Sequence, residues 1–187
     1  MDNSALTPRD SNERLLDKLT ARGVDVKACF QCTRCSGGCP IGDFFDLSVM
    51  EIVRLAAYGV EEPLLKAKTI WLCAACETCA TRCPNGIEIV ELMDVLRELA
   101  LRKGIAPAEP KVPLFHQAFL KTVQKRGRVW ELGMVADYKI KSGDLTTDAA
   151  LGMKMFGKGK LKLMPPSIKD KQAVQEIFSG KGKEYDR

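Results

Sequence analysis

The sequence predicts an all-α fold, and three observations lead to that prediction. All eight cysteines of the 187-residue chain fall into two runs with the same spacing. The runs are CFQCTRCSGGCP at 29–40 and CAACETCATRCP at 73–84, so that Cys73 repeats Cys29 44 residues later. Each run ends in proline and is followed by apolar residues at helical spacing, whereas the alternating β-branched runs typical of strands are missing. The sequence therefore predicts a helical repeat.

The helices of the N-terminal part can be placed from their apolar spacing and their end signals. A first helix is expected over 11–23, with Ser11 or Asn12 as its cap and Gly23 at its end. A second is expected after the first run, within 42–60, with Asp43 and Asp46 in its first turn, where the helix dipole favours acidic side chains. Its apolar face comprises Phe45, Val49, Ile52, Val53 and Ala56.

A third helix follows the second run. Its apolar positions are Ile89, Leu92, Met93, Val95, Leu96 and Leu99, and Arg102, Lys103 and Gly104 mark its end. Residues 1–104 are therefore expected to form one domain that contains both cysteine runs.

Residues 105–187 differ in texture and are expected to form a basic extension. A proline-rich linker reaches residue 113, two helices are expected over 114–125 and 129–138, and 141–164 has no firm period. After Pro165 and Pro166, Ser167 and Asp170 resemble a capping box that starts a last helix. This extension is expected to lie on a partner and not to form a core of its own.

Charge is distributed unevenly between these two parts. Acidic residues outnumber Lys and Arg by 15 to 13 in residues 1–103, whereas Lys and Arg outnumber acidic residues by 16 to 9 in residues 104–187. The basic excess lies wholly in the extension, where it suits an acidic partner.

Composition excludes several classes of protein. No apolar run is long enough to predict a membrane span, and the N-terminus lacks the basic and apolar regions of a secretory signal. A cytoplasmic location is therefore expected, where disulfides are unfavourable. No catalytic residue is expected, because no nucleophile and base pair, phosphate loop or flavin signature is found in the sequence.

The cysteine spacing is typical of 4Fe-4S clusters. Three thiolates at two-residue intervals reach three iron corners, and in two-cluster proteins of this spacing the fourth cysteine of each run ligates the other cluster. One cluster is therefore assigned to Cys29, Cys32, Cys35 and Cys83. The other is assigned to Cys73, Cys76, Cys79 and Cys39. The proline after each run is expected to turn the chain and start the next helix.

The neighbours of the cysteines and the other candidate ligands have plainer interpretations. Zinc sites pair C-x2-C units across a longer gap, which makes zinc much less favoured. Ser36, Gly37 and Gly38 are expected to let the first loop approach its cluster, giving it the higher reduction potential through more N–H···S contacts. Trp71 is expected over the second cluster or in the core, and His116 on a helix and not as a ligand.

The motif CxxCxxCSGGCP followed by WLCxxCxxCxxRCPxGIxIxxLMxxLR resembles the alpha-helical ferredoxin family, and within it the C subunits of methanogen heterodisulfide reductases. The resemblance covers about residues 13–103. It implies an electron-carrying subunit that relays electrons from a flavin-containing A subunit to a B subunit, which reduces the mixed disulfide of coenzyme M and coenzyme B in methanogenesis. It also implies a larger complex with a hydrogenase or a formate dehydrogenase.

Two alternatives remain open at the sequence level. The same helical domain occurs in iron-sulfur subunits of fumarate reductase and glycolate oxidase, although the extra cysteine motifs of those relatives are missing here. An iron-sulfur regulator that binds nucleic acid is less favoured, since the basic residues of the extension are spread among Gly and Pro and are not clustered with aromatic residues.

Overall fold

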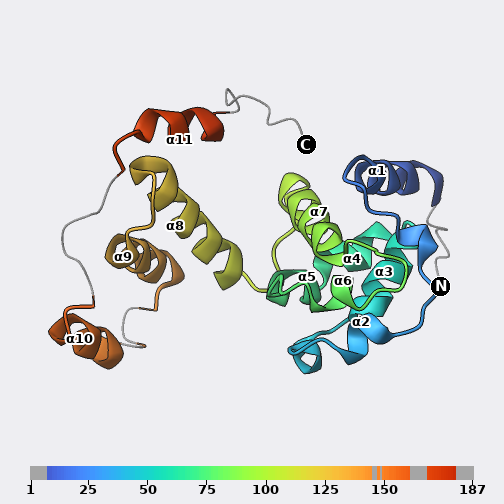
Figure 1. The fold of residues 1–187 in the computed structure, drawn as a ribbon, viewed down its shortest axis with the longest axis horizontal. Coiled ribbons are helices and arrows are strands. Elements are labelled where there is room, and N and C mark those ends of the chain that lie inside the picture. Colours follow the sequence, from blue (N-terminus) through green and yellow to red (C-terminus); the bar gives the residue numbers. More distant parts are fainter. Residues whose placement is uncertain (1–7, 145–146, 148, 161–167, 180–187) are drawn as a thin grey trace, which may run out of the picture. The chain divides into compact units, whose positions relative to one another are not determined.

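The computed structural model describes residues 8–144, 147, 149–160 and 168–179, and these residues contain helices and no strand (Figure 1). The predicted all-α class is confirmed. The chain divides into two compact units, Met1–Pro110 and Lys111–Arg187. No helix among the described residues is both long and apolar enough to cross a membrane.

The first unit contains seven α-helices and two 3₁₀ helices in its described part. The longer elements are α1 (Pro8–Ala21), α3 (Val49–Ala57), α4 (Glu61–Lys66) and α7 (Ile89–Arg102). The short elements are η1 (Val26–Ala28), α2 (Arg34–Gly37), η2 (Gly42–Phe44), α5 (Thr69–Leu72) and α6 (Thr78–Thr81).

The core of the first unit forms where α1, α3, α4, α5 and α7 pack together. Its fully buried side chains include Leu15, Leu19, Ile52, Leu64, Leu65, Ile70, Ile89, Leu92, Met93 and Leu96. These residues recur at three- and four-residue intervals, so each helix turns one apolar stripe inward. Trp71 is buried as well and lines neither cysteine pocket described below.

Two expected helix starts are wrong. α1 begins at Pro8, ahead of Ser11 and Asn12, because proline suits the first turn of a helix. α3 begins at Val49 behind Ser48, whose hydroxyl accepts a hydrogen bond from the Glu51 amide while the Glu51 carboxylate accepts one from the Ser48 amide. This capping box places Asp43 and Asp46 outside α3. The third predicted helix is confirmed as α7.

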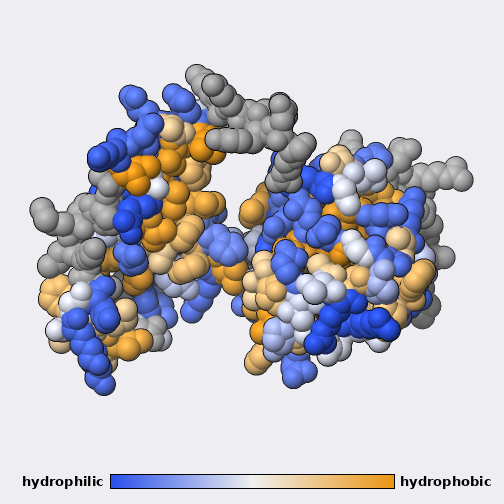
Figure 2. Space-filling model, viewed as in Figure 1, coloured by the Kyte–Doolittle hydropathy of each residue, from blue (hydrophilic) through white to orange (hydrophobic). Residues whose placement is uncertain are grey.

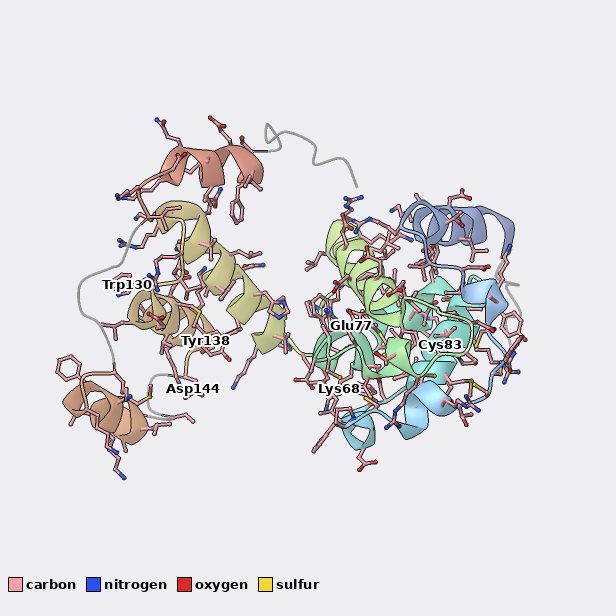
Figure 3. The ribbon with its side chains drawn as sticks, in the orientation of Figure 1. Lys68, Glu77, Cys83, Trp130, Tyr138 and Asp144 are labelled. Atoms are coloured by element: carbon pink, nitrogen blue, oxygen red, sulfur yellow. The ribbon has the colours of Figure 1, made fainter. Side chains whose placement is uncertain are left out.

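The segment after α7 stays with the first unit. The Lys68 ammonium and the Glu109 carboxylate form an ion pair of 3.1 Å, and Lys68 is labelled in Figure 3. This contact accounts for a unit boundary at Pro110, whereas the change of composition suggests a boundary at residue 104.

The second unit contains α8 (Lys111–Arg126), α9 (Glu131–Ser142), α10 (Ala149–Gly157) and α11 (Lys171–Phe178). α8 packs against α9 and α11. The Phe115 and Tyr138 rings meet edge to face at 5.6 Å, and the Arg126 guanidinium lies 4.7 Å from the centre of the Trp130 ring (Figure 3). The Trp130 ring also covers Gly133, where any side chain would collide with it.

The sequence predicts the helices of the second unit less well. α8 starts before Pro113, which its first turn accommodates, and α10 forms in a stretch where no period was expected. α11 is capped by Asp170, whose carboxylate accepts a hydrogen bond from the Ala173 amide, so the predicted capping box is wrong. Ser167 lies outside the described residues.

The ion pair between Lys103 and Glu61 provides a test of the packing of α4 on α7. Glu61 is 6 % exposed, its Oε2 accepts from the Lys103 ammonium, and its Oε1 has no partner. Lys103→Met is expected to destabilise the protein by about 2 kcal/mol, because a buried carboxylate loses its counter-charge. The loss is smaller than for a fully buried ion pair, because the lysine is partly exposed and solvent screens its charge. Anaerobic denaturant unfolding measures the change.

Lys66→Met is the matched control, since it breaks an exposed i,i+4 pair with Glu62. It is expected to leave the unfolding midpoint unchanged. Equal midpoints for both variants would show that the Glu61 pair does not hold α4.

Candidate metal centre

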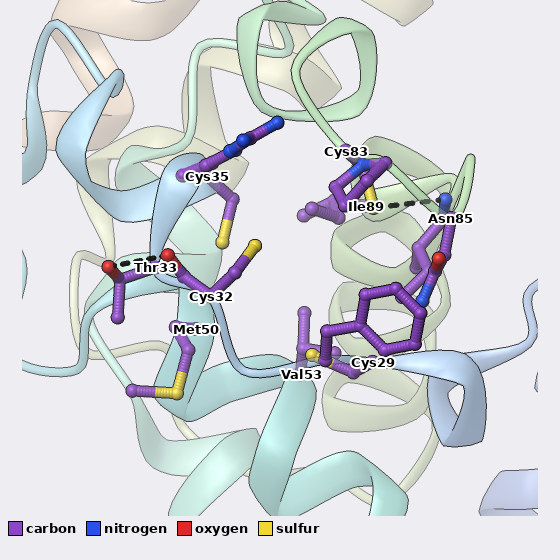
Figure 4. A pocket seen from close by; sticks show the side chains of 13 residues that line it. Cys29, Cys32, Thr33, Cys35, Met50, Val53, Cys83, Asn85 and Ile89 are labelled. Carbon is purple, nitrogen blue, oxygen red and sulfur yellow. Dashed lines mark hydrogen bonds between the residues drawn. The ribbon is translucent and has the colours of Figure 1, made fainter.

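The eight cysteines line two separate pockets of the first unit. The first cysteine pocket contains Cys29, Cys32, Cys35 and Cys83, and the second contains Cys39, Cys73, Cys76 and Cys79. Each pocket spans about 360 Å³, part of which is open to solvent. The side chains of Cys29, Cys32, Cys35 and Cys83 surround a common space in Figure 4. Each pocket therefore combines three cysteines of one run with the fourth cysteine of the other.

Apolar side chains close the pockets from behind. Met50 and Val53 of α3 line the first pocket together with Ile87 and Ile89. The second is lined by Val49 of α3, by Val90 and Met93 of α7, and by Ile41 and Phe45. α3 and α7 thus contribute walls to both pockets, which limits water on the inner side of the cysteines.

A β-turn at the end of each run delivers the fourth cysteine. The Gly42 amide donates to the Cys39 carbonyl at 3.3 Å, and the Gly86 amide donates to the Cys83 carbonyl at 3.2 Å. The proline after each cysteine occupies the second turn position, which its fixed φ favours. The expectation that this proline starts a helix is wrong, because α3 and α7 begin several residues later.

The second of these turns is tied to the other run. The Asn85 side-chain amide donates to the Ala28 carbonyl, directly before Cys29. This hydrogen bond holds Cys83 in the first pocket, although it lies in the second run. Asn85 was not singled out from the sequence.

Both cysteine loops place the same two positions in the left-handed region. φ is +54° at Gln31 and +62° at Thr33, and +51° at Ala75 and +60° at Glu77. None of the four is glycine, so each costs of the order of 1 kcal/mol or more. Strain that recurs at equivalent positions of a repeat indicates that the loop needs this shape to bring its three cysteines together.

Asp46 fixes the helix that leads into the second loop. Its carboxylate accepts hydrogen bonds from the Lys68 amide at 2.7 Å, the Thr69 amide at 3.0 Å and the Thr69 hydroxyl at 2.8 Å. Burial alone would raise the pKa of Asp46, but the hydrogen bonds from Lys68, Thr69 and Leu47 lower it below its ordinary value. Asp46 therefore caps α5, and not the helix in its own repeat.

Arg97 holds the other end of the same helix. Its Nη2 donates to the Cys73 carbonyl at 2.7 Å, and its Nε donates to the Ile70 carbonyl. The side chain is 14 % exposed. Arg97 lies one turn after the buried Met93, so it shares the inward face of α7. This position is the signal for its role, and it was not singled out from the sequence.

Hydrogen bonds to the sulfurs differ between the pockets. In the first, the Gln31 amide lies 3.3 Å from the Cys29 sulfur and the Ile87 amide 3.4 Å from the Cys83 sulfur. In the second, the Thr78 hydroxyl lies 3.4 Å from the Cys76 sulfur. Of the expected residues Ser36, Gly37 and Gly38, Ser36 contacts a sulfur: its hydroxyl lies 4.0 Å from the Cys35 sulfur. Burial raises the pKa of Cys35, and hydrogen bonds from Ser36 oppose that rise. A higher reduction potential for the first cluster stays a prediction.

Burial disfavours the ionisation of the third cysteine of each run. Burial raises the pKa of Cys79 to about 11, and the neighbouring Cys73 and Cys35 thiols add to the effect. Burial raises the pKa of Cys35 as well. By contrast, the Thr78 hydroxyl lowers the pKa of the exposed Cys76. Any group bound in the pockets must stabilise thiolates that the protein alone disfavours.

The two pockets are neighbours. α2, which carries Cys35, packs against α6, which carries Cys79. Repulsion from Cys35 contributes to the raised pKa of Cys79. Cys32 and Cys76 are instead exposed. Each pocket therefore has an inner cysteine that faces the other pocket and an outer cysteine that faces solvent.

Four thiols around an apolar-backed space fit a 4Fe-4S cluster, which takes one thiolate on each of four irons. Around one zinc ion the sulfurs would instead have to lie about 2.3 Å from a single point. Across the described residues, no group of three or more His, Cys, Asp or Glu side chains is arranged to hold one metal ion.

Comparison with known proteins bears on the same residues. Residues 28–88, which include all eight cysteines, match the family described as the 4Fe-4S dicluster domain. The chain carries two 4Fe-4S clusters. The predicted cofactors are thereby confirmed, while the assignment of single cysteines to each cluster stays a prediction.

The relatives match longer stretches of the chain. The C subunit of ferredoxin:CoB-CoM heterodisulfide reductase from Methanosarcina mazei is 41 % identical over 98 residues, which cover 52 % of this chain and 60 % of that protein. The C subunit of H(2):CoB-CoM heterodisulfide,ferredoxin reductase from Methanothermobacter marburgensis is 36 % identical over 101 residues, covering 53 % and 55 %. The predicted resemblance to the C subunits of heterodisulfide reductases is confirmed.

A third relative has the same extent. The iron-sulfur C subunit of CoB--CoM heterodisulfide reductase from Methanopyrus kandleri is 37 % identical over 93 residues, covering 49 % of this chain and 48 % of that protein. The chain thus spans about half the length of the curated relatives that it matches.

The pKa values predict the order in which the thiols of the cluster-free protein react. At pH 8, iodoacetamide is expected to modify Cys76 before Cys79. A pKa of about 11 leaves about a hundred-fold less thiolate at Cys79 than the ordinary value of 9.0. Mass spectrometry of the peptide that contains both residues measures the order. The difference should vanish in denaturant, and equal rates in the folded protein would contradict it.

Proposed function

We propose that this chain is an electron-transfer subunit with no catalytic residue of its own. Cys29, Cys32, Cys35 and Cys83 would hold one cluster, and Cys39, Cys73, Cys76 and Cys79 the other. The observation that carries the proposal is the sorting of the eight cysteines into two pockets, each completed by a cysteine of the other run. A 4Fe-4S cluster supplies one-electron transfer when bound.

The residues around the pockets suit this role. Asp46 and Arg97 fix the Cys73 loop, and Asn85 fixes Cys83, so the two sets of ligands keep their relative positions. The inner cysteines Cys35 and Cys79 lie on packed helices, which favours transfer between the clusters. Cys32 and Cys76 are exposed, so each cluster would have one ligand at the surface through which electrons can pass to a partner. We call these two surface positions the outlets.

The resemblance to the C subunits of heterodisulfide reductases supplies the wider role. We infer that electrons pass from a flavin-containing, iron-sulfur A subunit through this chain to a B subunit that reduces the heterodisulfide CoM-S-S-CoB in methanogenesis. A hydrogenase or a formate dehydrogenase would feed the larger complex, in the cytoplasm. Ferredoxin is part of the names of two relatives, and H(2) is part of the name of one of them.

The second unit is proposed to dock this chain onto those subunits. Many of its large apolar side chains are exposed, and Figure 2 shows hydrophobic residues gathered over α8 and α9. The set consists of Phe115, Phe119, Leu120, Val135, Ile140, Leu151, Met153, Met155, Phe156, Ile177 and Phe178. Apolar surface of this extent, among lysines such as Lys154, Lys158 and Lys160, is typical of a protein interface.

Pairs of cysteine substitutions test the ligand assignment. Cys29→Ala with Cys83→Ala removes two ligands of one proposed cluster, and about four irons per chain should remain of about eight. Cys29→Ala with Cys39→Ala removes a ligand from each cluster, and little iron should remain. Anaerobic iron and sulfide analysis measures both variants.

Cys32→Ala serves as the reference, because it removes one ligand of one cluster under either assignment. The opposite ranking of the two double variants would show that each run holds its own cluster. Zinc in the wild-type chain would refute the electron-transfer role itself.

Truncation tests the docking role. Removal of residues 144–187, after Gly143 ends α9, should leave the iron content unchanged and weaken binding to the A and B subunits at least tenfold in anaerobic pull-down titrations. Loss of iron would place these residues in the cluster-binding fold. Unchanged binding would contradict a docking role for the deleted part.

A further inference from the structure

We propose that the surface beside Cys32 is the docking site for a redox partner with an acidic rim, and that Arg34 and Arg82 recognise its carboxylates. This inference rests on the proposed electron-transfer function and gives one of the two outlets a specific chemistry. The surface is a shallow depression that is open to solvent. We call it the arginine surface, and it is lined by Cys32, Thr33, Arg34, Gly37, Thr81 and Arg82.

Arg34 and Arg82 of the arginine surface are both exposed. Neither forms an ion pair or a hydrogen bond with any residue that the structure describes. The other arginines of the first unit whose side chains are described have partners. Arg22 pairs with Glu91 and Glu98, Arg97 with Asp94, and Arg102 with Glu98, while Arg54 lies over the Tyr58 ring.

The internal repeat explains how two arginines come together here. Arg82 occupies the position in the second run that Gly38 occupies in the first. A methyl group on Gly38 would lie 2.3 Å from one Arg82 nitrogen, so the Arg82 side chain lies across Gly38. The Arg82 guanidinium therefore contacts the first run and lines the same surface as Arg34.

The other outlet has a different character. The residues that flank the exposed Cys76 in the sequence are Ala74, Ala75, Glu77 and Thr78, which include an acidic side chain and no basic one. The residues adjacent to the two exposed cysteines in the chain therefore differ in charge, with Arg34 near Cys32 and Glu77 beside Cys76. An anionic partner is attracted to the first and not to the second.

An exposed aromatic residue completes the contact. Phe30 lines the first cysteine pocket and is 73 % exposed. Aromatic residues and arginine are the types enriched at protein interfaces. A partner that buries Phe30 and pairs carboxylates with Arg34 and Arg82 would bring its redox group close to Cys32.

The test compares one-electron oxidants of opposite charge on the reduced, anaerobic holo-protein. Tris(oxalato)cobaltate(III) carries −3, and hexaammineruthenium(III) carries +3. Each takes one electron from a reduced cluster, giving Co(II) or Ru(II) and a cluster oxidised by one electron. Stopped-flow absorbance gives both rates, and their ratio reports the charge near the reacting cluster.

Arg34→Gln with Arg82→Gln is expected to lower the ratio of the anionic to the cationic rate by about tenfold or more at low salt. The effect should disappear near 1 M salt, where the Debye length falls to about 3 Å. The same variant should accept electrons more slowly from, or donate them more slowly to, an acidic flavodoxin used as a protein probe.

Arg102→Gln is the control for position, since it removes one arginine charge at the far end of α7. Thirteen residues of helix at 1.5 Å each place it about 20 Å from Ile89, beyond the Debye length of about 10 Å at 0.1 M salt. Its rate ratio should equal that of the wild type.

Gly38→Ala provides a variant that keeps every charge. Gly38 has φ −106°, which alanine adopts without strain, so the substitution displaces the Arg82 guanidinium alone. The rate ratio should change in this variant, in the direction of the double glutamine variant. If the double glutamine variant binds less iron, the rate ratio of Gly38→Ala alone tests whether the arginine surface attracts anions.

Two outcomes would overturn the inference. An unchanged ratio with a shifted midpoint potential would make the arginines counter-ions of the clusters. An unchanged ratio and an unchanged potential would make them solvated surface residues. Both outcomes leave a protein with two clusters that still exchanges electrons, so neither disturbs the proposed function.

Discussion

The exchange of the fourth cysteine between the two runs is the constraint on which the rest of the first unit depends. Neither pocket is complete unless residues 29–39 and 73–83 lie side by side. The helices between them, α3, α4 and α5, must therefore fold back within a fixed length. Metal binding and folding are coupled wherever a site is assembled from distant segments. In this chain the coupling joins both halves of the repeat.

The long-range hydrogen bonds meet that constraint from the protein side. Asp46 reaches from the first repeat to the start of α5, and Arg97 reaches from α7 to its end. Both orient the loop that carries Cys73. Each uses charged groups on backbone atoms, which give stronger hydrogen bonds than neutral pairs. These contacts offset part of the strain at the four left-handed residues.

Much of the site could be predicted from the sequence because cysteine spacing is a local signal with a specific geometric meaning. The same holds for α7, whose apolar period is unbroken. The roles of Asp46, Asn85 and Arg97 could not be predicted, since each depends on a partner 22 residues or more away. The apolar residues of α10 gave no period because that helix buries little, and burial is what imposes the period.

The contact between Gly38 and Arg82 shows that the two halves of the repeat have become specialised for each other. They occupy equivalent positions, yet one must be small so that the other can lie across it. A chain built from two copies of the first half would leave an empty space at this seam, and one built from two copies of the second would set guanidinium against guanidinium. The halves keep a common plan but are no longer interchangeable.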